Sequence, residues 1–231
     1  MSSRLSTRLS IRWIPGEPSE PTDTLVMSVG GWYVDLRITK KDGSIDWAMA
    51  GERLILAQEP WYTEPDIGSF QPVDSSSGSD SLESGSMINP ETNVETPYEE
   101  VWRSLPATST DRFGSAWILH SMDKKTFLGQ VGGDFLALKG GSEDAVGEKG
   151  FCARRENWDE VKECWTIKRE AGDSDNLRSL PSMLAFNEEG DKVQEPLWMQ
   201  EGKAGDTVEF FGEQYILCAL QSVLDPEKSG S

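Results

Sequence analysis

Apolar and polar residues alternate strictly along the N-terminal part of the chain. Between residues 4 and 13, Leu, Thr, Ile and Trp alternate with Arg and Ser, and a similar period of two returns at 32–38 and 44–50. Successive side chains of a strand point to opposite faces of a sheet, so this period predicts strands with one buried face.

Short turn sequences separate these segments. Gly30-Gly31 lies between the apolar stretches 24–29 and 32–38, and a polar run ending at Gly43 precedes 44–50. A two-residue glycine connection is typical of a β-hairpin. The pattern therefore predicts an antiparallel meander, which favours a barrel or sandwich over βαβ units.

The second half of the chain repeats this style after a joint at 106–111. Strand-like segments are expected at 116–121, 126–131, 135–139, 161–168 and 215–223, and no segment keeps a helical period over three turns. Residues 66–86 are rich in Ser, Gly and Asp, which predicts a mobile acidic loop. We expect an all-β chain with little helix.

The charge is strongly negative and uneven. The chain has 22 Lys and Arg against 40 Asp and Glu, which gives a formal net charge of −18. Residues 54–102 include ten acidic residues and no Lys or Arg. This charge disfavours nucleic acid and anionic lipid as partners. No apolar stretch reaches membrane-spanning length, so we expect no membrane insertion and a cytoplasmic location.

The residues on which most catalytic and metal sites depend are scarce. The chain has three widely spaced cysteines and one histidine, His120, without a CxxC pair, a GxSxG sequence or a phosphate-binding loop. We therefore expect neither a metal nor a cofactor. In a strand His120 lies opposite Trp117 and Leu119, which predicts an exposed or cavity-rim side chain and makes it a candidate proton donor or acceptor.

Nine tryptophans provide large rings that form either core or cavity walls. Beside them, Tyr33, Asp35 and Arg37 form a polar row on one face of a predicted strand. This row either faces solvent or aims hydrogen-bonding groups into a cavity. Trp61 and Tyr62 precede the predicted acidic loop and form either a lid or a loop anchor.

Several segments resemble one fungal family, of HRI type, which is named for a yeast protein that interacts with casein kinase I. The similar segments are SIRW at 10–13, WYVDLRI at 32–38, IDWAMAG at 45–51, GSMINPET at 85–92 and YEEVW at 98–102. The resemblance weakens after Asp111 and in the segment between Gly51 and Gly85. It implies two lipocalin-like antiparallel β-barrels, which we place at residues 1–108 and 109–231.

Lipocalin-like fungal barrels include cofactor-free pericyclases of secondary metabolism, and the chain is similar to the hetero-Diels-Alderases of tropolone-sesquiterpenoid biosynthesis. This resemblance implies the cycloaddition of a tropolone quinone methide with an apolar terpene such as a humulene. The alternatives are a protein-interaction module and a carrier of an apolar molecule, with homo-oligomer formation left open. Residue type and position suggest substrate-binding walls at Trp47, Trp61, Trp102 and Trp117, and hydrogen-bond donors at Tyr62, Arg103, His120 and Gln130.

Overall fold

The structure is a computed structural model of the 231-residue chain, and it describes residues 3–53, 69–73, 80–106, 113–140, 150–187 and 196–222. Of these residues 63% lie in strands and 9% in helices. The strands form two seven-stranded antiparallel sheets. The prediction of an all-β chain with little helix is therefore confirmed.

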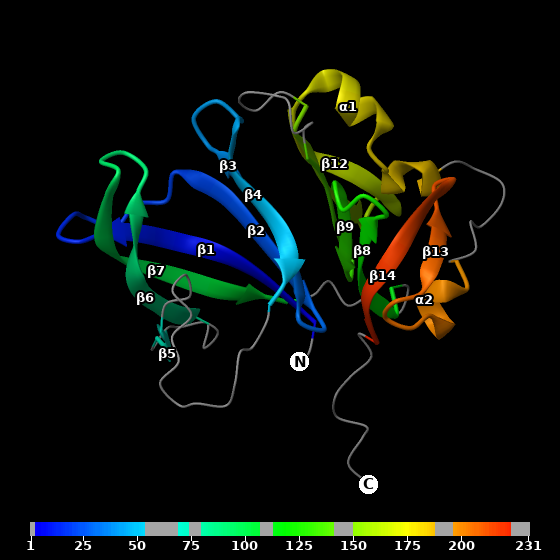
Figure 1. Ribbon diagram of the computed structural model, residues 1–231, viewed down its shortest axis with the longest axis horizontal. Helices are drawn as coiled ribbons and strands as arrows, with labels where there is room; N and C mark the ends of the chain where they lie inside the picture. The colour runs from blue at the N-terminus through cyan, green and yellow to red at the C-terminus, as the bar shows by residue number, and fades with distance from the viewer. Residues whose placement is uncertain are drawn as a thin grey trace, which may run out of the picture.

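The first sheet contains the first seven strands in the spatial order β4-β3-β2-β1-β7-β6-β5 (Figure 1). In chain order they are β1 (Arg4–Trp13), β2 (Thr22–Val29), β3 (Trp32–Thr39), β4 (Ile45–Glu52), β5 (Ser69–Pro72), β6 (Asp80–Asn89) and β7 (Val94–Leu105). The β2–β3 turn is the predicted hairpin. Its residues Gly30 and Gly31 have φ angles of 58° and 96°, a region that glycine enters without strain.

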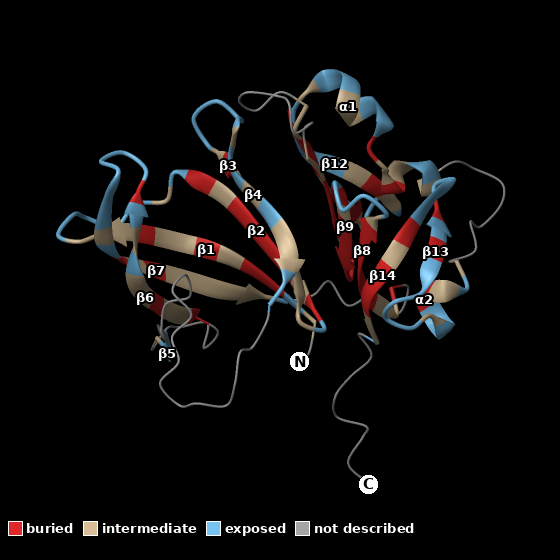
Figure 2. Cartoon of the chain, viewed as in Figure 1, coloured by how far each residue is buried: buried red, intermediate tan, exposed pale blue. Residues whose placement is uncertain are grey.

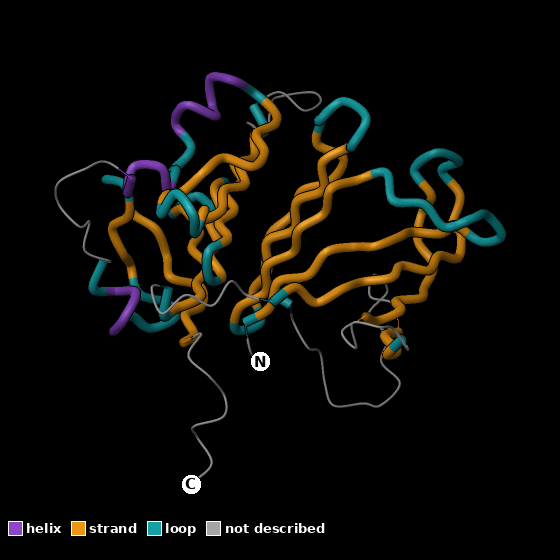
Figure 3. The backbone as a smooth tube through the Cα atoms, turned by 180° about the vertical axis from the view of Figure 1, so that it is seen from behind, coloured by secondary structure: helices purple, strands orange, loops and turns teal. Residues whose placement is uncertain are grey.

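The second sheet has the order β12-β11-β10-β9-β8-β14-β13. Its strands are β8 (Ser115–Ser121), β9 (Thr126–Val131), β10 (Asp134–Lys139), β11 (Cys152–Asp159), β12 (Cys164–Gly172), β13 (Thr207–Phe210) and β14 (Glu213–Ser222). Three short helices lie between β12 and β13 in the chain: α1 (Ser174–Ser179), η1 (Met183–Asn187) and α2 (Trp198–Glu201). Seen from behind, all three gather at this sheet (Figure 3).

Both sheets pair their first strand with their last, β1 with β7 and β8 with β14. This is the connectivity of an up-and-down meander that curls towards closure. The described pairings leave one break in each sheet, between β4 and β5 in the first and between β12 and β13 in the second. The two halves therefore share a topology, with the break displaced by one strand.

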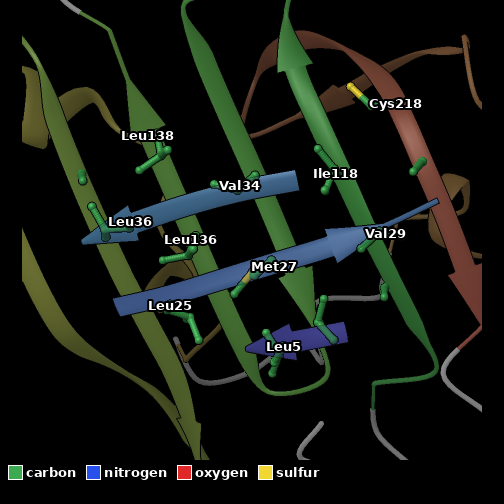
Figure 4. Packing of buried hydrophobic residues seen from close by; sticks show 14 of the residues in the cluster. Leu5, Leu25, Met27, Val29, Val34, Leu36, Ile118, Leu136, Leu138 and Cys218 are labelled. Carbon is green, nitrogen blue, oxygen red and sulfur yellow. The ribbon is translucent and has the colours of Figure 1, made fainter. Parts of the chain in front are cut away.

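One apolar cluster fills the contact between the two sheets. Strands of the first sheet cross those of the second at a steep angle, and buried side chains of both meet there (Figure 4). The sheets approach closely at Gly129, where a Cβ would be in ordinary van der Waals contact with Val34 Cγ2 at 3.4 Å and with Met27 Sδ at 3.5 Å. Among the members are Leu25, Met27, Val34, Leu36, Ile118, Leu136 and Leu138.

A second apolar cluster fills the other face of the second sheet. Trp117, Leu119, Leu128 and Phe135 are completely buried there, and side chains of the helical segment, including Met183 and Met199, cover them. The burial colours show both clusters as red bands along β2, β8 and β9 (Figure 2).

The predicted mobile loop at 66–86 is wrong for the part that the structure describes. Residues 69–72 form β5, and residues 80–86 belong to β6, which pairs with β7 over its whole length. Polar cross-strand contacts hold this strand, for example the ion pair of Asp80 with Arg103. A polar composition therefore did not prevent strand formation. Residues 66–68 and 74–79, and residues 107–111 of the predicted joint at 106–111, lie outside the described residues.

Candidate functional site

The two faces of the first sheet differ in character. The alternate residues Val34, Leu36 and Ile38 of β3 pack against the second sheet, whereas Asp35 and Arg37 point to the opposite side. We call this opposite side the polar face. Its other residues include Arg8 of β1, Thr22 and Thr24 of β2, Trp47 of β4, Glu83 of β6, and Tyr98, Glu100 and Trp102 of β7.

Two arginines share one buried carboxylate on the polar face. Glu100, only 3% exposed, forms an ion pair with Arg8, and its Oε1 lies 3.6 Å from Nη1 of Arg37. Arg8 also donates from Nε to Glu20 at 2.8 Å, and Arg37 donates from Nη2 to Asp35 at 2.9 Å. Each guanidinium group is thus fixed by at least two carboxylates.

The contact between Arg37 and Glu100 shows that the polar face is concave. Their strands β3 and β7 are separated by β2 and β1, a spacing of about 14 Å in a flat sheet. Side chains that stand perpendicular to such a sheet do not converge. The sheet must therefore curve towards this face, which gathers side chains from distant strands.

Arg37 lies between two tryptophan rings. Its Cζ is 6.0 Å from the ring centroid of Trp47 and 5.5 Å from that of Trp102. Both distances are within the range of cation–π attraction. Nε and Nη2 of Arg37 bond to Asp35, but Nη1 makes no hydrogen bond to any described residue. Among the described residues, Nη1 is therefore held only by the ion pair with Glu100 at 3.6 Å, beside the two indoles.

Glu83 fixes one wall of this arrangement. It accepts hydrogen bonds from the Tyr98 hydroxyl at 2.8 Å and from Trp102 Nε1 at 2.9 Å. Gly85 of the same strand leaves room for the phenol ring, because a Cβ there would lie 3.0 Å from a ring carbon of Tyr98. Its hydrogen bond to Glu83 therefore fixes the orientation of the Trp102 ring.

Burial and charge act against each other in the pKa values of the polar face. Burial raises the pKa of Asp35 and that of Glu100, although the neighbouring arginines oppose both shifts. Burial alone would lower the pKa of Arg8, but the hydrogen bond with Glu20 and the charge of Glu100 raise it. Arg8 therefore remains charged, and the carboxylates of Asp35 and Glu100 are held in a poorly solvated position.

Of the residues predicted from the sequence, the structure brings Trp47 and Trp102 together. Arg103 follows Trp102 in β7 and points to the opposite face, where its Nε and Nη2 donate to Asp80 at 2.8 and 2.9 Å. Trp61 and Tyr62 lie outside the described residues.

The three predicted residues of the second half are buried away from the polar face. Trp117 is part of the second apolar cluster, and Gln130 beside it donates from Nε2 to the carbonyl of Gly132 at 3.1 Å. His120 lies opposite Trp117 as predicted, but it is 7% exposed, so its predicted position at an exposed or rim site is wrong. The first sheet covers that face and brings Trp32 to 5.7 Å from the imidazole ring.

Arg8, Glu83 and Glu100 were not predicted from the sequence as members of the candidate site. A signal was present for Arg8, which stands in the alternating first strand. The two glutamates belong to the acidic stretch 54–102, which composition alone presents as solvated. Within the described ranges no group of three His, Cys, Asp or Glu side chains could hold a metal ion. No described helix is long and apolar enough to span a membrane.

Comparison with known proteins identifies the family. A family model described as Protein HRI1 matches residues 4–201. The chain belongs to the HRI1 family. Its fold is similar to the crystal structure of an uncharacterized protein from Saccharomyces cerevisiae, with a TM-score of 0.64 and 14% sequence identity over 96% of this chain and 100% of the yeast chain. None of the curated proteins matches this HRI1-family chain.

Proposed function

We propose that the polar face binds a planar, conjugated, oxygen-bearing molecule and that the protein is a cofactor-independent pericyclase. One observation carries the proposal: Arg37 lies beside Trp47 and Trp102, and among the described residues its Nη1 makes only an ion pair at 3.6 Å with Glu100, longer than a hydrogen bond. Indole rings stack on planar conjugated systems, and a guanidinium N–H binds a carbonyl oxygen.

The reaction we propose is a hetero-Diels-Alder cycloaddition. A quinone methide supplies a C=C–C=O unit, and a terpene alkene supplies two more π electrons. One C–C bond and one C–O bond form together, three π bonds become one, and no proton or leaving group is transferred. The protein is then required to orient the two partners and to polarise the carbonyl.

Arg37 is suited to polarise the carbonyl because its position is fixed in advance. Asp35 binds two of its nitrogens and Glu100 lies on its third side, so the guanidinium group needs little reorganisation when the substrate oxygen arrives. The two carboxylates that hold Arg37 are buried, and poor solvation strengthens a hydrogen bond to an oxygen that gains negative charge. Trp47 and Trp102 are placed to restrict the orientation of the conjugated ring.

The test is incubation of purified protein with a quinone methide precursor and humulene, against a reaction without protein. We expect Arg37→Gln to lower the rate of adduct formation by about a hundredfold, as for the loss of one oxyanion-type donor. The control is Arg12→Gln, because Arg12 pairs with Glu99 at the surface, away from the polar face. An adduct yield and stereochemistry equal to those without protein would reject the proposal.

A second candidate is a protein-interaction module. It is favoured by two exposed apolar side chains beside the β6–β7 turn, Ile88 at 57% and Val94 at 59% exposure. A module of this kind uses these residues and tolerates Arg37→Gln, so the same variant separates the two functions. A carrier would bind humulene or the precursor without changing the rate or the product ratio.

A further inference from the structure

We infer that a groove beside β4 is a binding site for an uncharged hydrocarbon of terpene size. The groove has a volume of about 310 Å³ and lies where the first part of β4 meets the second half of the chain. As the site of the second reactant, it rests on the proposed function; as a binding site, it stands on its own geometry.

The lining of the groove is mainly apolar. Ile45, Trp47 and Ala48 of β4 form one wall, and Phe151, next to β11, faces them. The volume is at the lower end of the range of roughly 300–1,000 Å³ that is usual for small-molecule pockets. Space of this size and character suits a compact hydrocarbon.

The polar groups of the groove do not favour a charged ligand. Asp46 and Ser44 are its polar side chains, and the Ser44 hydroxyl donates to Asp42 at 2.6 Å within the β3–β4 turn. No Lys or Arg is among the described residues that line the groove. An anion would be repelled by Asp46 and by the net charge of −18. A neutral apolar ligand meets no such penalty.

Trp47 connects the groove with the polar face. Its side chain is 51% exposed, which is high for an indole beside an apolar groove, so a ligand that covers it removes apolar surface from water. The same ring lies 6.0 Å from Arg37 Cζ. A hydrocarbon in the groove and a conjugated partner bound at Arg37 would therefore both lie beside this indole.

Glycine is required at the second wall. Gly172 has a φ angle of 98°, and a Cβ at this position would lie 2.2 Å from the carbonyl oxygen of Phe151. The absence of a side chain at residue 172 lets the backbone pass closely beside Phe151. The wall of the groove is thus a defined part of the fold.

The test is a titration of ¹⁵N-labelled protein with humulene, without any diene, so that it needs no turnover. The indole N–H signal of Trp47, assigned with Trp47→Phe, should shift on binding. Ala48→Leu should fill the groove and weaken the affinity about tenfold. The matched control is Ala50→Leu, because Ala50 is on the same face of β4 but does not line the groove; it should bind humulene like the wild type.

Circular dichroism verifies that each variant is folded. Should Ala48→Leu fail to fold, Trp47→Ala replaces it, since the half-exposed indole contributes little to either apolar cluster. An unshifted Trp47 signal, or wild-type affinity in the groove variant, would overturn the inference. If humulene binding depends on Ala48 while no adduct forms in the cycloaddition assay, the groove stands and the pericyclase proposal fails.

Discussion

Glu99 and Glu100 are consecutive residues of β7 whose side chains point to opposite faces of the sheet. Glu100 is 3% exposed and forms ion pairs with Arg8 and Arg37. The side chains of Glu99 and of its partner Arg12 are 33% and 37% exposed. Replacing each glutamate by glutamine therefore compares a buried with an exposed ion pair at nearly the same place in the fold.

Glu100→Gln removes the negative charge that the buried guanidinium group of Arg8 and the partly buried one of Arg37 share. Loss of one partner of a buried pair costs about 3–5 kcal/mol of unfolding free energy. Glu99→Gln breaks a pair that is screened by water, which costs about 0–1 kcal/mol. We expect a difference of at least about 2 kcal/mol between the variants, measured by urea denaturation at neutral pH with equal m-values.

A third variant separates the charge from the packing. Arg8→Met combined with Glu100→Leu removes both charges of the pair and keeps apolar volume, so it should be more stable than Glu100→Gln. Equal free energies of unfolding for Glu99→Gln and Glu100→Gln would refute the reasoning, because they would show that the polar face is accessible to water in solution.

Three further predictions concern stability. Gly129→Leu should destabilise the contact between the sheets by about 1–3 kcal/mol in a urea titration, while Gly129→Ala, whose Cβ meets ordinary contact distances, should cost less. Gly172→Ala should lower the melting temperature much more than Gly43→Ala, because both positions have positive φ but only the former collides with backbone. Burial raises the pKa of Glu156, so above the ordinary value of 4.5 the folded state binds more protons than the unfolded state. The unfolding free energy of the wild type relative to Glu156→Gln should therefore fall as the pH rises from 4.5 towards neutral. A rise over this pH range would contradict the sign of the pKa shift.

The sequence predicted the local elements better than their surroundings. The period of two identified β1 and β3, and the glycine pair identified the hairpin between β2 and β3, because both signals depend on neighbouring residues alone. His120 was placed on the correct face of β8, but its burial depends on a sheet that packs there from a distant part of the chain. Packing of this kind leaves no periodic signal in one strand.

The candidate site was predictable only in part for a similar reason. Trp47 and Trp102 were chosen for ring size, and the row of Asp35 and Arg37 was visible in the alternation of β3. Which of the two rows of alternating side chains in β3 faces the concave side depends on the curvature of the whole sheet. The ion pair of Glu100 with Arg8 depends on the pairing of β7 with β1. The acidic composition of β6 suggested a solvated loop. Its acidic side chains instead bind partners on the neighbouring strand β7.

The two halves share a topology, but the faces that point away from the contact between the sheets differ in character, and the candidate site lies on the charged one. In the second half, Trp117, Phe135 and the helical segment fill the face with close-packed rings that leave Trp117 at 0% exposure. In the first half, charged groups occupy the corresponding face, and the buried apolar side chains lie at the contact between the sheets. A face that carries buried charges contributes little net stability. Stability therefore depends mainly on the two apolar clusters, so folding constrains the residues of the polar face less than those of the clusters.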